Sequence, residues 1–315
     1  MKYTINEDGS VTKKLPTPSG GSDGNTGCWV VLFIAIVIGV IVFAIANNNN
    51  SSQEDYLADS TFYSEDIVEA SDTIAVAAAP ESQNNIKKIE NYESTAKGGW
   101  KHSGTIISNF VETGGLTTCK SKIDKNNACR NGCIVGEGKG VVIVGKNNYT
   151  SEGLPDYINN VLAQYRSKGS RINDIVITTS FKYVIIEEDN GFSNYTELPE
   201  LDKELNRANK NRETIYSVAM NDKGSWAVIT DQCYTSAGFF DEIERADKKY
   251  GGIKSVTMTE NAIVVCCNRG VYYKNIPKNL AEALNELYWI PEYIKFTDGG
   301  TFLITDGKSN FYYYM

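Results

Sequence analysis

The sequence predicts a repeat fold of the α+β class, with about five β-hairpins joined by four amphipathic helices and one transmembrane helix near the N-terminus. Paired strand-like runs recur at spacings of 37–43 residues, and an amphipathic segment separates each pair from the next. A single hairpin with its helix cannot bury both of its faces, so neighbouring units must stack. Because the chain ends just after a strand, with no polar capping unit, we expect the array to close into a propeller-like ring.

Each predicted hairpin pairs two short apolar runs across a turn. The first runs begin at Ile172, Ile215, Ile253 and Tyr293, and the second runs begin at Tyr183, Trp226, Ile263 and Phe302. Alternating apolar residues within such runs are typical of half-buried strands. The turns at 221–225 (NDKGS) and 297–301 (TDGGT) supply the Asp and Gly residues that a tight hairpin needs. Residues 133–149 predict one more hairpin, so the repeats begin at about residue 133.

The predicted helices lie between the hairpins. Apolar side chains recur at helical spacing from Leu154 to Tyr165 in the first helix and from Ile276 to Leu287 in the last. Three of the four helices start with a proline, which loses no hydrogen bond there and has a suitable φ angle: Pro155, Pro199 and Pro277. The third helix has Phe240 instead, and we expect it to form all the same, because proline is not required at that position.

An uncharged stretch of nineteen residues, 28–46 (CWVVLFIAIVIGVIVFAIA), predicts a transmembrane helix, because about twenty apolar residues cross the hydrocarbon core of a bilayer. Its length and its distance from the first residue favour an uncleaved signal anchor over a cleaved signal peptide. Three lysines precede it (Lys2, Lys13 and Lys14), whereas residues 47–60 carry three acidic residues and no basic one. Basic residues stay on the cytoplasmic side, so we expect a single-pass membrane protein with a cytoplasmic N-terminus and an extracytoplasmic C-terminal domain.

The chain is thus divided into four parts. Residues 1–27, rich in Gly, Ser, Thr and Asn, predict a disordered cytoplasmic tail ahead of the helix at 28–46. Residues 47–97 carry ten acidic residues and three lysines, which predicts an acidic flexible linker. Residues 98–315 form the extracytoplasmic repeat domain, with 25 basic and 26 acidic residues. A nearly neutral domain lacks the clustered Lys and Arg of nucleic-acid-binding proteins, so we expect no nucleic-acid partner.

The chain is poorly equipped for nucleophilic or metal-dependent catalysis. His102 is the sole histidine, so any Ser-His-Asp or Cys-His system would depend on it, and no GxSxG stretch presents a serine. Cys119, Cys129 and Cys133 lack the paired spacing of zinc sites. In an oxidising compartment we expect a disulfide among these three cysteines instead. The sequence therefore predicts no catalytic residue, no metal and no cofactor.

Aromatic residues follow the second strand of every unit: Tyr149, Phe192, Tyr195, Tyr234, Tyr272, Tyr273 and Phe311. Stacked repeats would place these side chains in a row or ring, the kind of surface that binds sugars, peptides or a partner protein. The alternative is that they pack the start of each helix against the sheet. The sequence alone leaves both interpretations open.

The repeated order of a hairpin, a glycine with an aromatic residue, the dipeptide Ile-Pro and an amphipathic helix resembles tandem repeats of bacterial extracytoplasmic and peptidase-associated proteins. The resemblance covers about residues 133–315 and is clearest at 223–229 (KGSWAVI). Trp226 keeps the tryptophan of those repeats, whereas Tyr183, Ile263 and Phe302 replace it. Such repeats are accessory modules, so the resemblance implies no catalytic residues.

These observations predict a membrane-anchored, non-enzymatic repeat domain that recognises a protein, peptide or glycan partner at the cell envelope. Residues 28–46 would provide its contact with the membrane. The alternative is a cell-envelope hydrolase that uses acidic residues in the segment 98–133, which lies ahead of the repeats and carries no repeat pattern.

Overall fold

The computed structural model describes residues 3–6, 8–15, 88–107, 129–136, 139–145 and 148–315. Of the described residues, 45% lie in strands and 21% in helices. All of these described residues belong to one compact unit. The described part of the protein is therefore mostly β-sheet, which differs from the predicted α+β ring of hairpins joined by helices.

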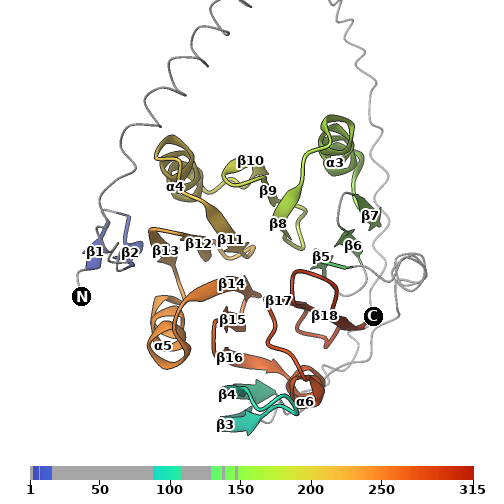
Figure 1. Cartoon of the computed structure of the whole chain (residues 1–315). Helices are drawn as coiled ribbons and strands as arrows, with labels where there is room; N and C mark the ends of the chain where they lie inside the picture. The colour runs from blue at the N-terminus through green and yellow to red at the C-terminus, as the bar shows by residue number, and fades with distance from the viewer. Residues whose placement is uncertain (1–2, 7, 16–87, 108–128, 137–138, 146–147) are drawn as a thin grey trace, which may run out of the picture. The chain divides into compact units, whose positions relative to one another are not determined.

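Five three-stranded antiparallel units recur along the chain (Figure 1). They are β5 (Asn131–Val135), β6 (Gly140–Val144) and β7 (Tyr149–Glu152); β8 (Ile172–Ile177), β9 (Tyr183–Glu187) and β10 (Gly191–Tyr195); β11 (Ile215–Met220), β12 (Trp226–Thr230) and β13 (Cys233–Ala237); β14 (Ile253–Met258), β15 (Ile263–Cys267) and β16 (Gly270–Pro277); and β17 (Tyr293–Phe296), β18 (Phe302–Thr305) and β19 (Phe311–Tyr314). The helices that connect them are α3 (Asp156–Lys168), α4 (Pro199–Lys210), α5 (Phe240–Tyr250) and α6 (Lys278–Glu286). Each repeat thus has one strand more than predicted.

The local predictions of strand pairs and helix starts are confirmed. The first and second strands of the last four repeats begin at the predicted residues, from β8 to β18. Pro155 and Pro277 are the N-cap residues of α3 and α6, and Pro199 is the first residue of α4. Helix α5 starts at Phe240 without a proline. These features depend on a few neighbouring residues, which is why the sequence predicts them well.

The predicted closed ring of helix-linked hairpins is wrong. Among the described residues, the repeats form five separate small sheets, and no strand of one repeat pairs with a strand of another. Side chains instead accept hydrogen bonds from backbone N–H groups on the first strand of the next repeat: Cys133 Sγ from Ile177 N at 3.2 Å, Asp174 Oδ2 from Val218 N at 3.0 Å, and Ser217 Oγ from Val256 N at 3.2 Å. A backbone N–H that is bound to a side chain is not free to extend a sheet.

Apolar cores lie between neighbouring sheets and beneath the helices. Leu162 of α3 shares a core with Val142 of β6 and Ile185 of β9. Leu205 of α4 shares the next core with residues of β9 and β12, such as Val228. The same arrangement repeats beneath α5 and α6. A fully buried leucine contributes about 1.5–3 kcal/mol, so the helices stabilise each junction between sheets.

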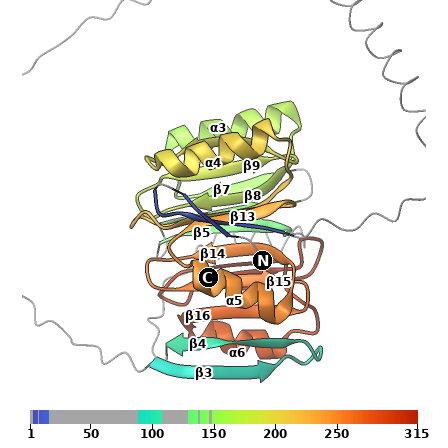
Figure 2. The ribbon, with the colours of Figure 1, turned by 90° about the vertical axis from the view of Figure 1, so that its left-hand side faces the viewer.

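Two of the sheets carry extra strands on their outer edges. β1 (Tyr3–Ile5) and β2 (Val11–Lys14) form a hairpin, and β2 pairs antiparallel with β13. β3 (Lys88–Thr95) and β4 (Lys101–Ile107) form a second hairpin, and β4 pairs in parallel with β16 (Figure 2). Parts of the predicted disordered tail, 1–27, and of the predicted flexible linker, 47–97, are therefore strands of the folded unit.

The predicted single-pass membrane topology is also wrong. A chain that crosses a membrane once would keep residues 1–27 and 98–315 on opposite sides, but β2 and β13 pair within one sheet. The predicted transmembrane segment, 28–46, lies outside the described residues. Within the part that is described, no helix is both long enough and apolar enough to cross a membrane. These findings overturn the predicted signal anchor, the single-pass location and the membrane contact.

Gly104 allows β4 to approach β16. Its φ angle is +156°, and a Cβ atom at this position would overlap the backbone oxygen of Tyr273. Gly104→Ala is therefore expected to push β4 away from β16 and to lower the free energy of unfolding by about 1–3 kcal/mol or more, as measured by thermal denaturation. Gly99→Ala is the control, because Gly99 has a φ angle of +80° but no atom within 4 Å of the added Cβ. Equal losses in both variants would contradict a role for the close approach.

Candidate functional site

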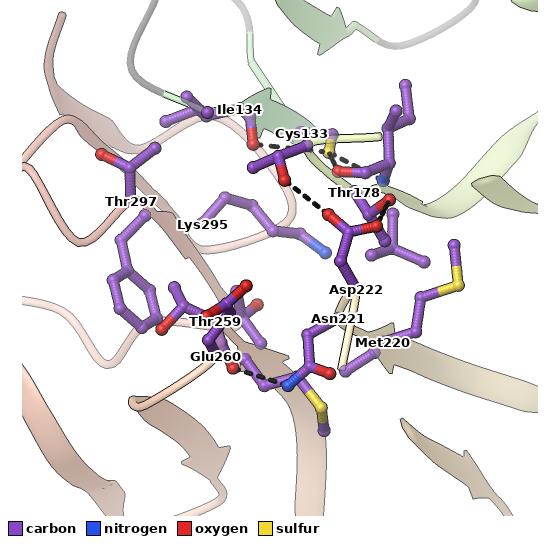
Figure 3. A pocket seen from close by; sticks show the side chains of 18 of the residues that line it. Cys133, Ile134, Thr178, Met220, Asn221, Asp222, Thr259, Glu260, Lys295 and Thr297 are labelled. Atoms are coloured by element: carbon purple, nitrogen blue, oxygen red, sulfur yellow. Dashed lines mark hydrogen bonds between the residues drawn. The ribbon is translucent and has the colours of Figure 1, made fainter. Parts of the chain in front are cut away.

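A pocket opens where the first strands of all five repeats end. The cavity has a volume of about 420 Å³ and is lined by residues at the ends of β5, β8, β11, β14 and β17 (Figure 3). These strands lie side by side, from β5 next to β8 through β14 next to β17, and β17 also contacts β5. One strand end from every repeat therefore borders the same space, although no hydrogen-bonded ladder joins the sheets.

The second-last residue of each first strand lines this pocket. We call these five the wall residues: Ile134, Val176, Ala219, Thr257 and Lys295. Side chains alternate between the two faces of a strand, so the residue that follows contributes to an apolar core, as Ile177 and Met258 do. Each repeat thus contributes the end of its first strand to the pocket, and residues such as Ile177 and Met258 border both a core and the pocket.

Asp222, on the rim of the pocket, ties the third repeat to the second. Its carboxylate accepts hydrogen bonds from Thr178 Oγ1 at 2.6 Å, from Ser180 N at 3.1 Å and from the Thr179 hydroxyl. Burial raises the pKa of Asp222, but the hydrogen bonds from Ser180, Thr178 and Thr179 outweigh it and leave the pKa below its ordinary value. The group is therefore a charged acceptor with its partners in place.

The rim continues in the same way across the next two repeats. Asn221 Nδ2 donates to the backbone oxygen of Thr259 at 2.8 Å, and Thr259 Oγ1 donates to Asp298 Oδ1 at 2.7 Å. Each bond joins a turn of one repeat to the turn of the next. The entrance of the pocket is consequently held by side chains from four repeats and not by one loop.

Lys295 is the one charged residue among the five wall residues, and it is only 4% exposed. Its Nζ lies 2.7 Å from Asp174 Oδ1 and 3.3 Å from the backbone oxygen of Ile175. A buried ammonium is tolerated only with a charged partner and further hydrogen bonds. The ion pair with Asp174 therefore stabilises a buried lysine at this position of the pocket.

Asp174 is fully buried beside the wall and links four repeats. Besides Lys295, its carboxylate accepts from Asn131 Nδ2 at 3.0 Å, Ser217 Oγ at 2.8 Å and Val218 N at 3.0 Å. A fifth bond comes from the neighbouring backbone N–H of Ile175 at 2.9 Å. The donors come from the first, second, third and fifth repeats, so this carboxylate fixes the first strands relative to one another.

The aromatic residues predicted to bind a partner do not line the pocket. They lie on the third strands of five different sheets: Tyr149 on β7, Phe192 and Tyr195 on β10, Tyr234 on β13, Tyr272 and Tyr273 on β16, and Phe311 on β19. Tyr234, Tyr272 and Tyr273 are buried in apolar cores, whereas Tyr195 is 50% exposed. The structure does not gather these side chains into one surface, and their binding role stays a prediction.

The cysteines of the predicted disulfide cluster are in part described. Cys129 and Cys133 are buried free thiols, and Cys119 lies outside the described residues. Cys133 lines the pocket, and burial raises the pKa of its thiol to about 11. In the residues that the structure describes, no group of three or more His, Cys, Asp or Glu side chains is arranged to hold a metal ion.

Two further predicted features lie elsewhere. His102 is buried in β4, where its Nδ1 lies 3.0 Å from the Tyr273 hydroxyl and its Nε2 lies 3.0 Å from Asn285 Oδ1. The acidic residues of the segment 98–133, on which the alternative hydrolase depends, are Glu112 and Asp124, and both lie outside the described residues. His102 does not line the pocket.

The residues that give the pocket its chemistry are not among the predicted site residues: Asp174, Thr257 and Lys295. A signal was present, because aligning the five first strands places Lys295 and Thr257 where the other repeats have Ile134, Val176 and Ala219. A lysine is unusual at a buried strand position that is apolar in other repeats. What the sequence could not supply is the partner, Asp174, which lies 121 residues away.

The chain matches no protein-family model, and it matches no curated protein. The resemblance to bacterial extracytoplasmic repeats therefore stays a prediction, and the function has to be inferred from the geometry and chemistry of the pocket.

Proposed function

We propose that this domain is a non-enzymatic recognition module that binds a small organic molecule in the pocket between its five repeats. The observation that carries the proposal is the convergence of one strand end from every repeat on a cavity of about 420 Å³, with the buried ammonium of Lys295 in its wall. Ligand pockets have volumes of about 300–1,000 Å³, are mostly apolar and contain a few fixed polar groups. The pocket has each of these properties.

The hydrogen bonds around the pocket support a pre-formed site. Asp222 holds the rim between the second and third repeats, and Asp174 holds the first strands beside the wall. Side chains and loops that are already fixed lose little freedom when a ligand binds, so less of the interaction energy is spent on ordering them. A rigid pocket of this kind suits selective binding of one class of molecule.

Two titratable groups of the pocket, Cys133 and Asp222, support binding over turnover. An enzyme of the acyl-transfer or hydrolytic kind needs an activated nucleophile or a base that faces its substrate. The Cys133 thiol has its pKa raised to about 11 by burial, so it is protonated and unreactive at neutral pH. The Asp222 carboxylate already accepts four hydrogen bonds, and His102 lies in β4 with its own partners.

Filling the pocket tests the proposal. In Val176→Trp, the larger side chain of this wall residue fills part of the cavity. The variant is therefore expected to abolish binding of small-molecule fragments. The measurement is the shift of the Ile134 and Ala219 methyl signals in NMR spectra when uncharged fragments are added at millimolar concentration. Wild type is expected to show saturable shifts at these methyl groups, and the variant is expected to show none.

The matched control is Ala163→Trp, which adds the same indole to an exposed position of α3 away from the pocket. It is expected to bind fragments as the wild type does. Fragment shifts that persist in Val176→Trp, or that spread evenly over exterior methyl groups in the wild type, would show that the cavity is not a binding site.

A further inference from the structure

The five wall residues are chemically unequal. Ile134, Val176 and Ala219 are apolar and come from the first three repeats, whereas Thr257 and Lys295 are polar and come from the last two. The strands that carry the polar pair, β14 and β17, lie side by side. Among the wall residues, the apolar side chains therefore come from one part of the array and the polar pair from the other, although all five occupy the same position in their repeats.

Lys295 has a hydrogen-bond donor to spare. An ammonium group has three N–H donors, and Asp174 Oδ1 and the backbone oxygen of Ile175 accept two of them. Among the residues that the structure describes, no third acceptor bonds to Nζ. One N–H is thus available to an acceptor atom inside the pocket, while the charge of the ammonium is already balanced by Asp174.

Thr257 supplies a second group in need of a partner. Its Oγ1 is buried and has no hydrogen-bond partner within the described part of the chain. A buried hydroxyl without a hydrogen bond costs about 1–3 kcal/mol. Rotation about the Cα–Cβ bond exchanges the hydroxyl with the methyl group, so an acceptor atom in the pocket can receive a bond from Thr257 as well as from Lys295.

We infer that the ligand is a small uncharged molecule with a carbonyl oxygen and an apolar body, an inference that rests on the function proposed above. The carbonyl oxygen accepts hydrogen bonds from Lys295 and Thr257, and the body packs against Ile134, Val176 and Ala219. A carboxylate would add a negative charge near Asp174 and the acidic rim, and an ammonium group would face Lys295. Both charged classes carry a penalty of repulsion or desolvation that a neutral carbonyl avoids.

Four probes of similar size test this polarity: cyclohexanecarboxamide, cyclohexanecarboxylate, cyclohexylmethylamine and cyclohexane. Each is titrated into the full chain, and the dissociation constant is taken from the methyl NMR signals of Ile134 and Ala219. The carboxamide is expected to bind most tightly. Thr257→Val is expected to weaken carboxamide binding about fivefold, the size of one neutral hydrogen bond, and to leave cyclohexane binding unchanged.

The variant Thr257→Val keeps the shape of the side chain and removes a hydroxyl that has no partner, so its thermal stability is expected to match or exceed that of the wild type. Val176→Thr is the matched control, because it adds a hydroxyl on the apolar side and is expected not to strengthen carboxamide binding. Equal binding of the carboxamide and the charged probes, or no effect of Thr257→Val, would overturn the inference and leave the pocket proposal standing. Absence of binding by all four probes would overturn both.

Discussion

Replacing Asp174 by alanine is expected to lower the free energy of unfolding by about 3–5 kcal/mol, because the change leaves the buried Lys295 ammonium without its counter-ion. The same change removes the acceptor for Asn131 Nδ2, Ser217 Oγ and the backbone N–H of Val218. Buried donors without partners add to the cost. Urea denaturation followed by circular dichroism measures the loss as a lower midpoint.

Two further variants show whether the ion pair is the cause. Lys203→Met removes an exposed pair with Glu200 on α4, whose side chains are 78% and 42% exposed, and is expected to cost at most about 1 kcal/mol. The double variant Asp174→Asn, Lys295→Met removes both charges and is expected to recover part of the loss. A loss below about 1 kcal/mol in Asp174→Ala would contradict the assigned role.

The elements that the sequence predicted correctly depend on local patterns. The first and second strands of most repeats are rich in Val and Ile, and the turns at 221–225 and 297–301 contain Asp and Gly, so these strand starts follow from short windows. The helices are marked by apolar residues at helical spacing and by Pro155, Pro199 and Pro277. In each case the physical cause lies within about one turn or one strand of the residue concerned.

The elements that the sequence missed depend on distant partners. The third strands are short and largely polar, as in β7 and β10, and they are stable because they pair with β6 and β9. β2 pairs with β13, more than two hundred residues further along the chain. Strand formation of this kind depends on the tertiary context more than on intrinsic preference. The aromatic residues predicted as a binding surface are the apolar residues of these third strands.

The pocket could be predicted only in part, because it too depends on residues that are distant in the sequence. The repeat pattern implies that equivalent residues such as Val176 and Lys295 come close together, since repeats stack in register. Which of the equivalent positions face a cavity depends on the alternation of side chains along each first strand. That alternation is imperfect in the sequence, because a bulge interrupts the pairing between Ile172 and Asp174. A bulge changes the faces of the residues on either side of it.

Arg207 forms a second buried charge network, at the junction of α4 with β12 and β13. Its guanidinium lies 2.8 Å from both carboxylate oxygens of Glu204 and 2.9 Å from Glu213 Oε2. Glu204 and Glu213 are 8% and 7% exposed, and they also accept from Thr235 Oγ1 and Thr230 Oγ1 at 2.9 Å. One arginine therefore balances two buried carboxylates and holds the end of α4 on its sheet.

Arg207→Met is expected to lower the free energy of unfolding at neutral pH by about 2–4 kcal/mol, somewhat less than for a fully buried pair because the guanidinium is 34% exposed. The loss is expected to depend on pH. In the wild type, burial raises the pKa of Glu213, but the hydrogen bonds from Arg207, Thr230 and Asn211 lower it by a larger amount. The pKa of Glu213 therefore lies below its ordinary value. The stability that Glu213 provides is then present above its unfolded pKa of about 4.3 and is lost as the pH falls through the lower folded pKa.

In the variant, Arg207 no longer lowers the pKa of Glu213, whereas burial still raises it, so the folded pKa is expected to be higher than in the wild type. Acid is then expected to destabilise the variant less than the wild type, because a carboxylate with a higher folded pKa loses less stability when it is protonated. Urea denaturation at a series of pH values is expected to show the largest difference between the two proteins near pH 7 and a smaller one below about pH 5. Lys210→Met, on the exposed surface of the same helix, is the control and is expected to show a small difference at every pH. A difference between Arg207→Met and the wild type that stays constant or grows in acid would mean that buried carboxylates do not set the stability of this junction.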